Sequence, residues 1–150
     1  MKILLAIDDS TFSEAATQAV IQQMRRERTE VCVLHVFQPL VLSSMLESQS
    51  IVETLEANER ERKKEAKELV ARGERLLSKA GFKVRTAVEV GDPRAVIIDY
   101  AVKWKADLIV LGSHGRKGLG RFLIGSVAEF VVRHTSCSVE IVRIPGTAKA

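Results

Sequence analysis

The sequence has few of the residues that mark several common classes of protein. Only 5% of its 150 residues are aromatic, and it contains two cysteines and three prolines. Two cysteines give no metal-ligand spacing, and we expect Cys32 and Cys137 to be buried free thiols because both lie in or beside apolar strand patterns. No apolar run approaches the roughly 20 residues that span a bilayer. These absences argue against a disulfide scaffold, a metal cluster of cysteines and a membrane span.

The start and the charge of the chain bear on its location and partners. The chain opens directly into the apolar run 3–7, without the features of a secretory signal, so we expect a cytoplasmic protein. Its net charge is +4 and its pI is near 9.3, but positive residues alternate with negative ones. A nucleic-acid surface combines a basic stripe with interleaved aromatics. We therefore expect no nucleic-acid partner, and no membrane partner either.

Strand-like and helix-like patterns alternate along the whole chain. Apolar runs predict five strands, and the segments between them predict four helices. This alternation implies right-handed βαβ crossovers and an α/β fold, a doubly wound and mainly parallel five-stranded sheet with helices on both faces. Without a repeat or a linker, residues 1–150 are expected to form a single domain whose tail, 147–150, is frayed. The predicted strands are 2–7, 31–37, 84–90, 108–111 and 139–144.

Capping residues predict where the first and third helices begin. Ser10 or Ser13 can cap the first helix, and Asp92 can cap the third with Pro93 at its first position. The basic run 25–28 is expected to end the first helix, because cations suit the negative end of the helix dipole.

The middle of the chain is less regular. The segment Pro39–Ser50 is either a lid or partner-binding loop, or an ordinary irregular connection. The long helix that follows is expected over roughly Ile51–Ala80, with a core stripe toward its end. Its charged segment 58–65 is interpreted as a solvated, overhanging turn rather than a docking site.

A glycine-rich stretch, residues 112–126, links the fourth predicted strand to the last predicted helix. Its five glycines permit positive φ, and their backbone N–H groups can turn toward one point to bind an anion. Ser126 stands three residues before Glu129, so it is expected to be the N-cap of a capping box. The free N–H groups and the dipole of that helix end favour the same anion. Phosphate is the first candidate, and a glycine-rich connection without a ligand is the alternative.

The glycine spacing matches neither of two better-known phosphate loops. It lacks the lysine of the P-loop, and Leu123 stands where the dinucleotide fingerprint requires its third glycine. The spacing that remains, Gly112-x2-Gly115-x9-Gly125-Ser126, resembles the nucleotide-binding branch of the universal stress protein family. The resemblance extends to residues 1–10, 31–36 and 91–93, and so covers most of the chain.

This resemblance implies a site for an adenine nucleotide. In ATP-binding relatives the acid after the first strand meets the ribose, the second strand contacts adenine through its backbone, and the glycine loop surrounds the phosphates. Two of these assignments have an alternative. Asp8 either contacts the ribose or is a turn or helix-capping acid. His114 either contacts phosphate or holds the loop by hydrogen bonds. The matching residues are Ala6, Asp8, Val36, Gly112, His114, Gly115, Arg116, Gly125, Ser126 and Val127.

The resemblance also implies a cofactor, an assembly and a function. ATP with Mg²⁺ or Mn²⁺ is the expected ligand, and a homodimer through Val139–Ile144 is the expected assembly, although Glu140 departs from the family's apolar strand. The predicted function is that of a cytoplasmic, ATP-binding stress-response protein in which the nucleotide is a regulatory ligand. The alternatives are a nucleotide-free dimeric interaction protein and a slow ATPase. No nucleophile–base pair stands out, so at most slow hydrolysis is expected.

Overall fold

The computed structural model describes residues 1–39, 49–115 and 123–144. Arg116, most of the segment Pro39–Ser50 and the predicted tail 147–150 lie outside the described residues. The five predicted strands and four predicted helices are all present. In chain order the elements are β1 (Lys2–Ala6), α1 (Thr11–Gln23), η1 (Arg26–Arg28), β2 (Glu30–Phe37), α2 (Gln49–Lys79), β3 (Lys83–Val90), α3 (Pro93–Trp104), β4 (Leu108–Gly112), α4 (Ser126–His134) and β5 (Ser138–Val142).

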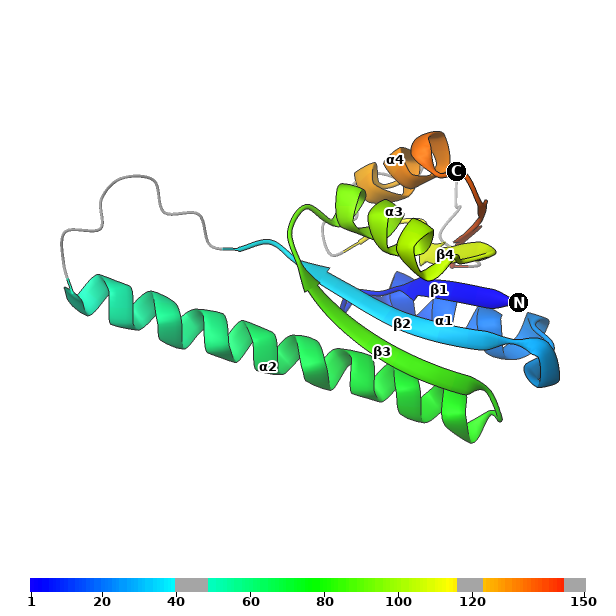
Figure 1. Ribbon diagram of the computed structural model, residues 1–150, viewed down its shortest axis with the longest axis horizontal. Helices are drawn as coiled ribbons and strands as arrows, with labels where there is room; N and C mark the ends of the chain where they lie inside the picture. Colours follow the sequence, from blue (N-terminus) through cyan, green and yellow to red (C-terminus); the bar gives the residue numbers. More distant parts are fainter. Residues whose placement is uncertain (40–48, 116–122, 145–150) are drawn as a thin grey trace.

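The strands form one parallel sheet in the order β3-β2-β1-β4-β5 (Figure 1). β1 lies at the centre because its side chains are apolar enough for burial on both faces: Ile3, Leu4 and Leu5 are fully buried. From β1 the chain builds outward to β3 on one side and then crosses to β4 and β5 on the other. The carboxyl ends of β1 and β4 therefore flank a topological switch point, where α/β sheets place their ligands.

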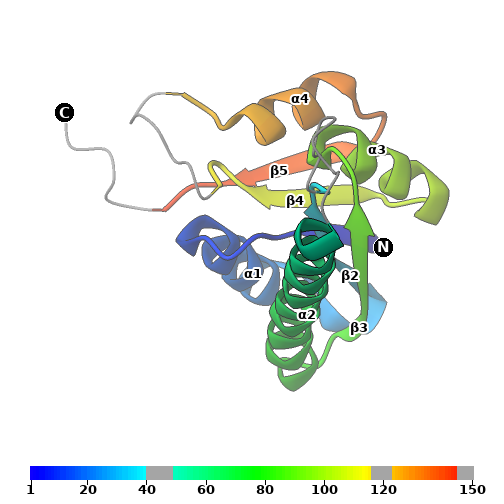
Figure 2. The ribbon, with the colours of Figure 1, turned by 90° about the vertical axis from the view of Figure 1, so that its left-hand side faces the viewer.

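Helices cover both faces of the sheet, as the alternating pattern predicted. Figure 2 shows α1 and α2 on one face and α3 and α4 on the other. Neighbouring residues of β2 illustrate the two layers, because Val33 belongs to the core cluster that includes Val20 and Leu77, whereas Leu34 belongs to the cluster that includes Trp104. The doubly wound α/β fold is thus confirmed.

The predicted helix starts at Ser10 and Asp92 are confirmed by their capping bonds. Ser10 Oγ accepts the N–H of Ser13 at 3.3 Å, and Asp92 Oδ1 accepts the N–H of Arg94 at 3.0 Å. The predicted end of α1 is wrong, because the basic run 25–28 does not continue the helix. Met24 adopts extended backbone (φ −97°, ψ 147°), and the basic run forms the separate 3-10 turn η1.

Helix α2 is much longer than the sheet that it covers. Its 31 residues extend about 46 Å at 1.5 Å per residue. Its buried residues, Ala66, Val70, Gly73 and Leu77, all lie in the C-terminal half, and Figure 1 shows the other half extending past the strands. The charged segment 58–65 is exposed except for half-buried Arg62, in line with its interpretation as a solvated face. Among the residues described, no helix is long and apolar enough to cross a membrane.

Candidate functional site

The switch point brings the segments after β1 and β4 together. These strands pair up to Ala6 opposite Leu111, so Asp8 and the start of the glycine loop emerge at the same edge of the sheet. A Cβ added to Gly115 would lie 2.7 Å from Oδ2 of Asp8, a distance that forces one of the two to move. Gly115 therefore lies against the Asp8 carboxylate, and a side chain at position 115 would require that carboxylate to shift.

The start of α4 folds back onto the same point. The N–H of Gly125 donates to the carbonyl of Ser113 at 2.7 Å. A Cβ added to Gly125 would lie 3.1 Å from that carbonyl oxygen and 3.2 Å from Cα of His114. Gly125 is therefore tightly packed against the backbone of residues 113–114, and this contact places the N-terminus of α4 beside the end of β4.

The predicted capping box at Ser126 is wrong. Gly125 is the N-cap, Ser126 is the first helical residue, and no side chain caps this helix. Glu129 forms an ion pair with Arg133 at 2.9 Å, on the following turn. Tight contact with Ser113 selects glycine at the cap position, and glycine has no side chain to accept a bond. Among the described residues, the first turn of α4 therefore has no side-chain cap, and N–H groups at such a helix end can bind anions.

Gly112 serves a different purpose from the other two site glycines. It is buried, and an added Cβ would lie 2.6 Å from Cβ of Phe12 and 2.8 Å from the Phe12 carbonyl carbon. Gly112 thus lets the first turn of α1 pack against β4. The expected positive φ is absent from the described part of the loop, where Gly125 has φ −58°, and the described glycines with positive φ are Gly81 and Gly91.

Asp8 organises the turn between β1 and α1. Its Oδ1 accepts the Ser10 N–H at 3.0 Å, the Ser13 hydroxyl at 2.8 Å and the Ser10 hydroxyl. The N–H of Asp8 in turn donates to Ser13 Oγ at 2.8 Å. These bonds confirm the turn role that the sequence left open for Asp8. They direct Oδ1 toward α1, while Oδ2 faces Gly115.

The backbone of Val36 points toward the switch point. The Ile7 N–H donates to the carbonyl of Leu34 at 2.9 Å, and the Gly91 N–H donates to that of Phe37 at 3.0 Å. Backbone groups of a strand alternate in direction from one residue to the next. Leu34 and Val36 therefore face the β1 side, and Phe37 faces the β3 side. Because β1 ends at Ala6, the N–H and C=O of Val36 reach the space beyond that strand.

The side chain of His35 hydrogen-bonds to the backbone just after the end of β1, a contact that sequence reasoning missed. Ala6 is the last residue of β1 and lies opposite Leu34 and Leu111. The following carbonyl, that of Ile7, accepts a hydrogen bond from Nδ1 of His35 at 2.7 Å. The sequence does place a histidine near the end of a buried strand. Its bond to the Ile7 carbonyl could not be predicted, because that bond requires β1 and β2 to be neighbours in the sheet.

His114 lies between the loop and α1. Its ring centroid is 5.1 Å from that of Phe12, and its Nδ1 is 3.1 Å from Oγ of Ser113. Nε2 is buried and has no hydrogen-bond partner among the residues that the structure describes. Sequence reasoning missed the buried Ser113 hydroxyl, although it stands beside His114 in the motif. The structure thus gathers Asp8, His114, Gly115 and Gly125, whereas the half-buried Val127 packs against the core under α4.

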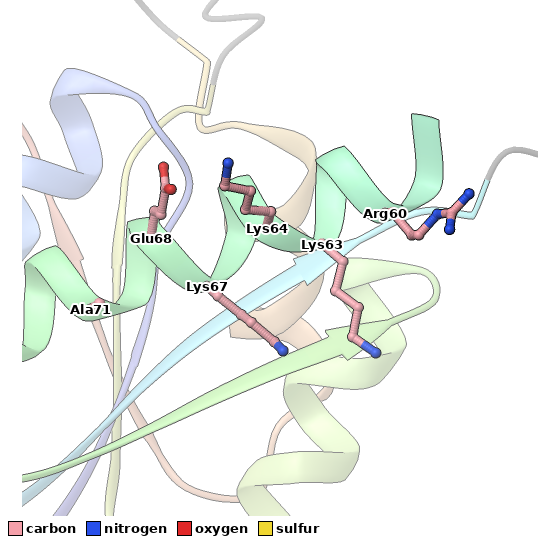
Figure 3. A pocket seen from close by; sticks show the side chains of 6 residues that line it. All are labelled: Arg60, Lys63, Lys64, Lys67, Glu68 and Ala71. Carbon is pink, nitrogen blue, oxygen red and sulfur yellow. The ribbon is translucent and has the colours of Figure 1, made fainter. Parts of the chain in front are cut away.

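A second concave surface lies on α2, away from the switch point. It has a volume of about 370 Å³ and every lining residue comes from α2 itself. Figure 3 shows Lys63 and Lys67 pointing to one side of the helix, and Lys64 and Glu68 to the other. Among the described residues, no strand end or helix N-terminus contributes to it, so this part of the chain gives it none of the convergent backbone donors of the first site. Its lining residues are Arg60, Lys63, Lys64, Lys67, Glu68 and Ala71.

Known proteins share both the sequence pattern and the fold. The model of the universal stress protein family matches residues 1–143. Universal stress protein Sll1388 of Synechocystis sp. is 33% identical over 153 residues, which cover 95% of this chain and 97% of the relative. The solved structure of hypothetical protein MJ0577 superposes with a TM-score of 0.81 at 28% identity, covering 97% of this chain and 96% of the other.

More distant structures with the same fold contain nucleotides. A universal stress protein in complex with cAMP has a TM-score of 0.63 at 19% identity, covering 95% of this chain and 96% of the other. A family protein from Arabidopsis thaliana with AMP bound has a TM-score of 0.64 at 16% identity, covering 100% and 96%. At these identities the likeness shows the fold alone. The match over residues 1–143 decides the family: this chain belongs to the universal stress protein family.

Proposed function

We propose that this protein binds ATP at the switch point and acts in the stress response of the cytoplasm, with the nucleotide as a regulatory ligand. One observation carries the proposal: the N-terminus of α4, which no described side chain caps, lies against the end of β4, next to Asp8 and Gly115. A helix end of this kind attracts negative charge. Gly115 and Gly125, which lack side chains, leave the backbone open to close approach by the phosphates.

The adenine ring is proposed to lie beside the end of β2. Adenine presents an amino donor next to a ring-nitrogen acceptor on one edge. The Val36 carbonyl and N–H supply the complementary acceptor and donor, and both face the β1 side beyond Ala6. The apolar surface of the half-buried Val36 side chain adds contact to the base.

Asp8 is proposed to meet the ribose, because a carboxylate accepts hydrogen bonds from sugar hydroxyls. Its Oδ1 is engaged by Ser10 and Ser13, which hold the carboxylate in one orientation. Mg²⁺ or Mn²⁺ is proposed to bridge the phosphates, since these cations prefer oxygen ligands and offset the charge of a triphosphate.

Two observations support an adenine nucleotide as the ligand. The family structures that contain AMP and cAMP share this fold. The sequence also places Arg116 and Lys117 directly after Gly115, where cations suit a longer phosphate chain. Together these features favour an adenine nucleotide, and the additional charge favours ATP among them.

A homodimer is proposed to form along β5, within the segment Val139–Ile144. β5 is an edge strand, and its Val142 carbonyl accepts the Ser113 N–H at 2.8 Å. By alternation the backbone groups of Ile141 face away from β4, toward the open edge. Glu140 is half-buried and opposite Val110, and its side chain points to a face of the sheet rather than along the edge. Glu140 is therefore compatible with pairing between two subunits.

Mass spectrometry of the gently purified, undenatured protein tests nucleotide and dimer together. The expected mass is that of two chains with bound ATP. Calorimetry on the nucleotide-free protein then measures affinity. A protein that carries no nucleotide and shows no ATP affinity would instead be the nucleotide-free interaction protein.

A further inference from the structure

Strand β3 forms one edge of the sheet, and its outer side has no strand partner among the residues described. The order β3-β2-β1-β4-β5 leaves it paired with β2 alone. Proteins usually protect such an edge with a short strand, a proline or a bulge. β3 is 8 residues long, contains no proline, and pairs with β2 residue for residue over Lys83–Val90. Its outer side is therefore long and regular enough to pair with a further strand.

The direction of the backbone groups shows which residues of β3 face the open side. The Gly91 N–H donates to the Phe37 carbonyl at 3.0 Å, so the backbone of Gly91 faces β2. Backbone groups alternate along a strand, so every second residue before Gly91 also faces β2. The residues between them present their N–H and C=O groups to the open side, and within the described part of the chain these groups have no hydrogen-bond partner. These outward residues are Val84, Thr86, Val88 and Val90.

The side chains of the outward residues lie on the face of the sheet that α2 covers. Val84 and Val88 pack against the core cluster that contains Leu77 of α2, whereas Ala87 packs against the cluster on the other face. All of the outward residues are uncharged and β-branched, a type that favours strand pairing. Val90 is 49% exposed. An added strand would therefore also cover apolar surface beside the edge.

Two lysines of α2 lie on the side of that helix where β3 runs. Figure 3 shows Lys63 and Lys67 pointing to this side and Lys64 pointing to the other. Lys63 and Lys67 are exposed, and neither forms an ion pair with a described residue. Ammonium groups beside an open strand edge favour acidic side chains on the strand that pairs there.

The opposite face of β3 is also mainly basic. Arg85 is exposed and lies over the Trp104 ring, with its Cζ 5.9 Å from the ring centroid. The Lys83 side chain is 78% exposed, and its Nζ lies 3.6 Å from Oε2 of Glu30. Glu89 is the one acidic residue of β3. Charges of this kind discourage pairing with an arbitrary strand and select a strand of opposite charge.

We propose that the outer side of β3 binds an extended, acidic segment of a partner protein, which adds a strand to the sheet. The backbone of that segment would pair with the outward residues, a recognition mode known as β-augmentation. A second copy of this chain fits less well. Pairing β3 with β3 would place two copies of α2 on one face of the joined sheet, with Lys63 and Lys67 of each turned toward the other. The site lies on the edge opposite β5 and does not depend on the nucleotide.

Amide hydrogen exchange of the unmodified protein, followed by NMR, tests the site with a defined probe. The probe is a blocked peptide of alternating glutamate and threonine, as long as β3, and alternating lysine and threonine is the control peptide. In the free protein we expect fast exchange at the outward amides and slow exchange at Arg85, Ala87 and Glu89, whose N–H groups face β2. The saturating acidic peptide should slow exchange of the outward amides by at least about tenfold, and the basic peptide should leave it unchanged.

A matched set of lysine variants tests the charge recognition. Titration of the same amide signals gives the affinity for the acidic peptide. We expect Lys63→Glu combined with Lys67→Glu to lose at least about fivefold in affinity. Lys64→Glu, on the other side of α2, should stay within about twofold of the unmodified protein. Equal losses in both variants would contradict a specific role of Lys63 and Lys67.

A pair of substitutions at Thr86 tests the backbone pairing. Thr86→Pro removes one outward N–H, a change that edge strands tolerate, whereas Thr86→Ala keeps that donor. We expect Thr86→Pro to lose at least about fivefold in peptide affinity and Thr86→Ala to lose less than about twofold. Should Thr86→Pro fail to fold, the exchange measurement on the unmodified protein decides the question.

Three results would overturn the proposal. The first is an unmodified protein whose outward amides the acidic peptide does not protect. The second is equal protection by the acidic and the basic peptide, which would remove the charge preference. The third is protection that rises with protein concentration in the absence of any peptide, which would assign the edge to a second copy of this chain.

Discussion

Cys32 and Tyr100 meet where α3 packs on β2, with Sγ of Cys32 and the phenol oxygen of Tyr100 hydrogen-bonded at 3.5 Å. Burial raises the pKa of the Cys32 thiol, and the bond with Tyr100 opposes that shift. For Tyr100, burial is the larger cause and the bond with Cys32 the next, and together they raise its pKa from 10.0 to about 12. The uncharged phenol is therefore the form that the folded protein favours.

This pair predicts the alkaline behaviour of the protein. Tyr100 is the only tyrosine, so ultraviolet titration of tyrosinate reports it alone. We expect a native midpoint near 12 and, in Cys32→Ala, a lower midpoint that stays above 10 because burial persists. Since the folded pKa is raised, the stability contributed by Tyr100 is complete below pH 10 and is lost as the pH rises through about 12. A native midpoint at the value of the urea-unfolded chain would contradict the prediction.

Replacing Gly115 or Gly125 with valine should abolish most ATP binding. The new Cβ would lie 2.7 Å from Asp8 Oδ2 in the first case and 3.1 Å from the Ser113 carbonyl oxygen in the second. The first contact displaces the Asp8 carboxylate and the second strains the loop backbone, and either valine side chain would block the approach of the phosphates, so we expect a loss of more than about tenfold, measured by calorimetry. Lys64→Ala, on the exposed face of α2, is the matched control and should bind ATP normally. Unchanged affinity in both valine variants would place the nucleotide elsewhere.

The backbone of Val36 should make the site prefer ATP to GTP. Guanine presents a carbonyl oxygen and a ring N–H where adenine presents an amino group and a ring nitrogen. Both polar contacts with the Val36 C=O and N–H would then be reversed, so we expect GTP to bind at least about tenfold more weakly. Competition calorimetry measures the ratio. Equal affinities would show that the base does not contact β2 in this way.

Proline at position 141 should weaken the proposed dimer without breaking the β4–β5 pairing. The Ile141 N–H faces the open edge, whereas the Val142 carbonyl faces Ser113. We expect Ile141→Pro to give a monomer by light scattering at micromolar concentration, with a cooperative thermal transition retained. Val142→Pro is the contrasting variant, because it removes an N–H on the β4 side and should lower the unfolding temperature itself. An unmodified protein that is monomeric at the same concentration would refute the dimer.

ATP should be bound and released far more often than it is cleaved. The uncapped helix end and the loop amides also stabilise charge in phosphoryl transfer, so slow hydrolysis is physically reasonable. Within the described site, however, the Asp8 carboxylate already accepts bonds from Ser10 and Ser13. We expect turnover well below the range of about 1–1000 per second that is typical of enzymes. Steady-state phosphate release near one per second, lost in Gly125→Val, would make the protein an ATPase.

The parts of the fold that sequence predicts well are those decided by neighbouring residues. Ser10 and Asp92 each bond to an N–H two or three residues ahead, so the sequence alone shows both helix starts. The central strand was also predictable, because a continuous apolar run such as 3–7 fits a strand buried on both faces.

The parts of the site that sequence predicts poorly are decided by contacts between distant segments. Ser126 carries the local signature of a cap, yet Gly125 takes that position because the Ser113 carbonyl approaches it. Gly112 matches a phosphate motif, yet its requirement for glycine comes from Phe12, a hundred residues earlier. No local sequence pattern shows why glycine stands at position 112 or at position 125, because each contact depends on which strands become neighbours in the sheet.

Ser113 forms hydrogen bonds to three different parts of the molecule. Its N–H holds the last residue of β5 through the Val142 carbonyl, its carbonyl holds Gly125 at the start of α4, and its hydroxyl holds the imidazole of His114. Because all three bonds belong to one residue, a substitution that shifts the backbone of Ser113 would alter the contacts of the helix end, the ring and the outer strand together. The edge strand of the sheet and the start of the glycine-rich segment are therefore anchored at one shared residue.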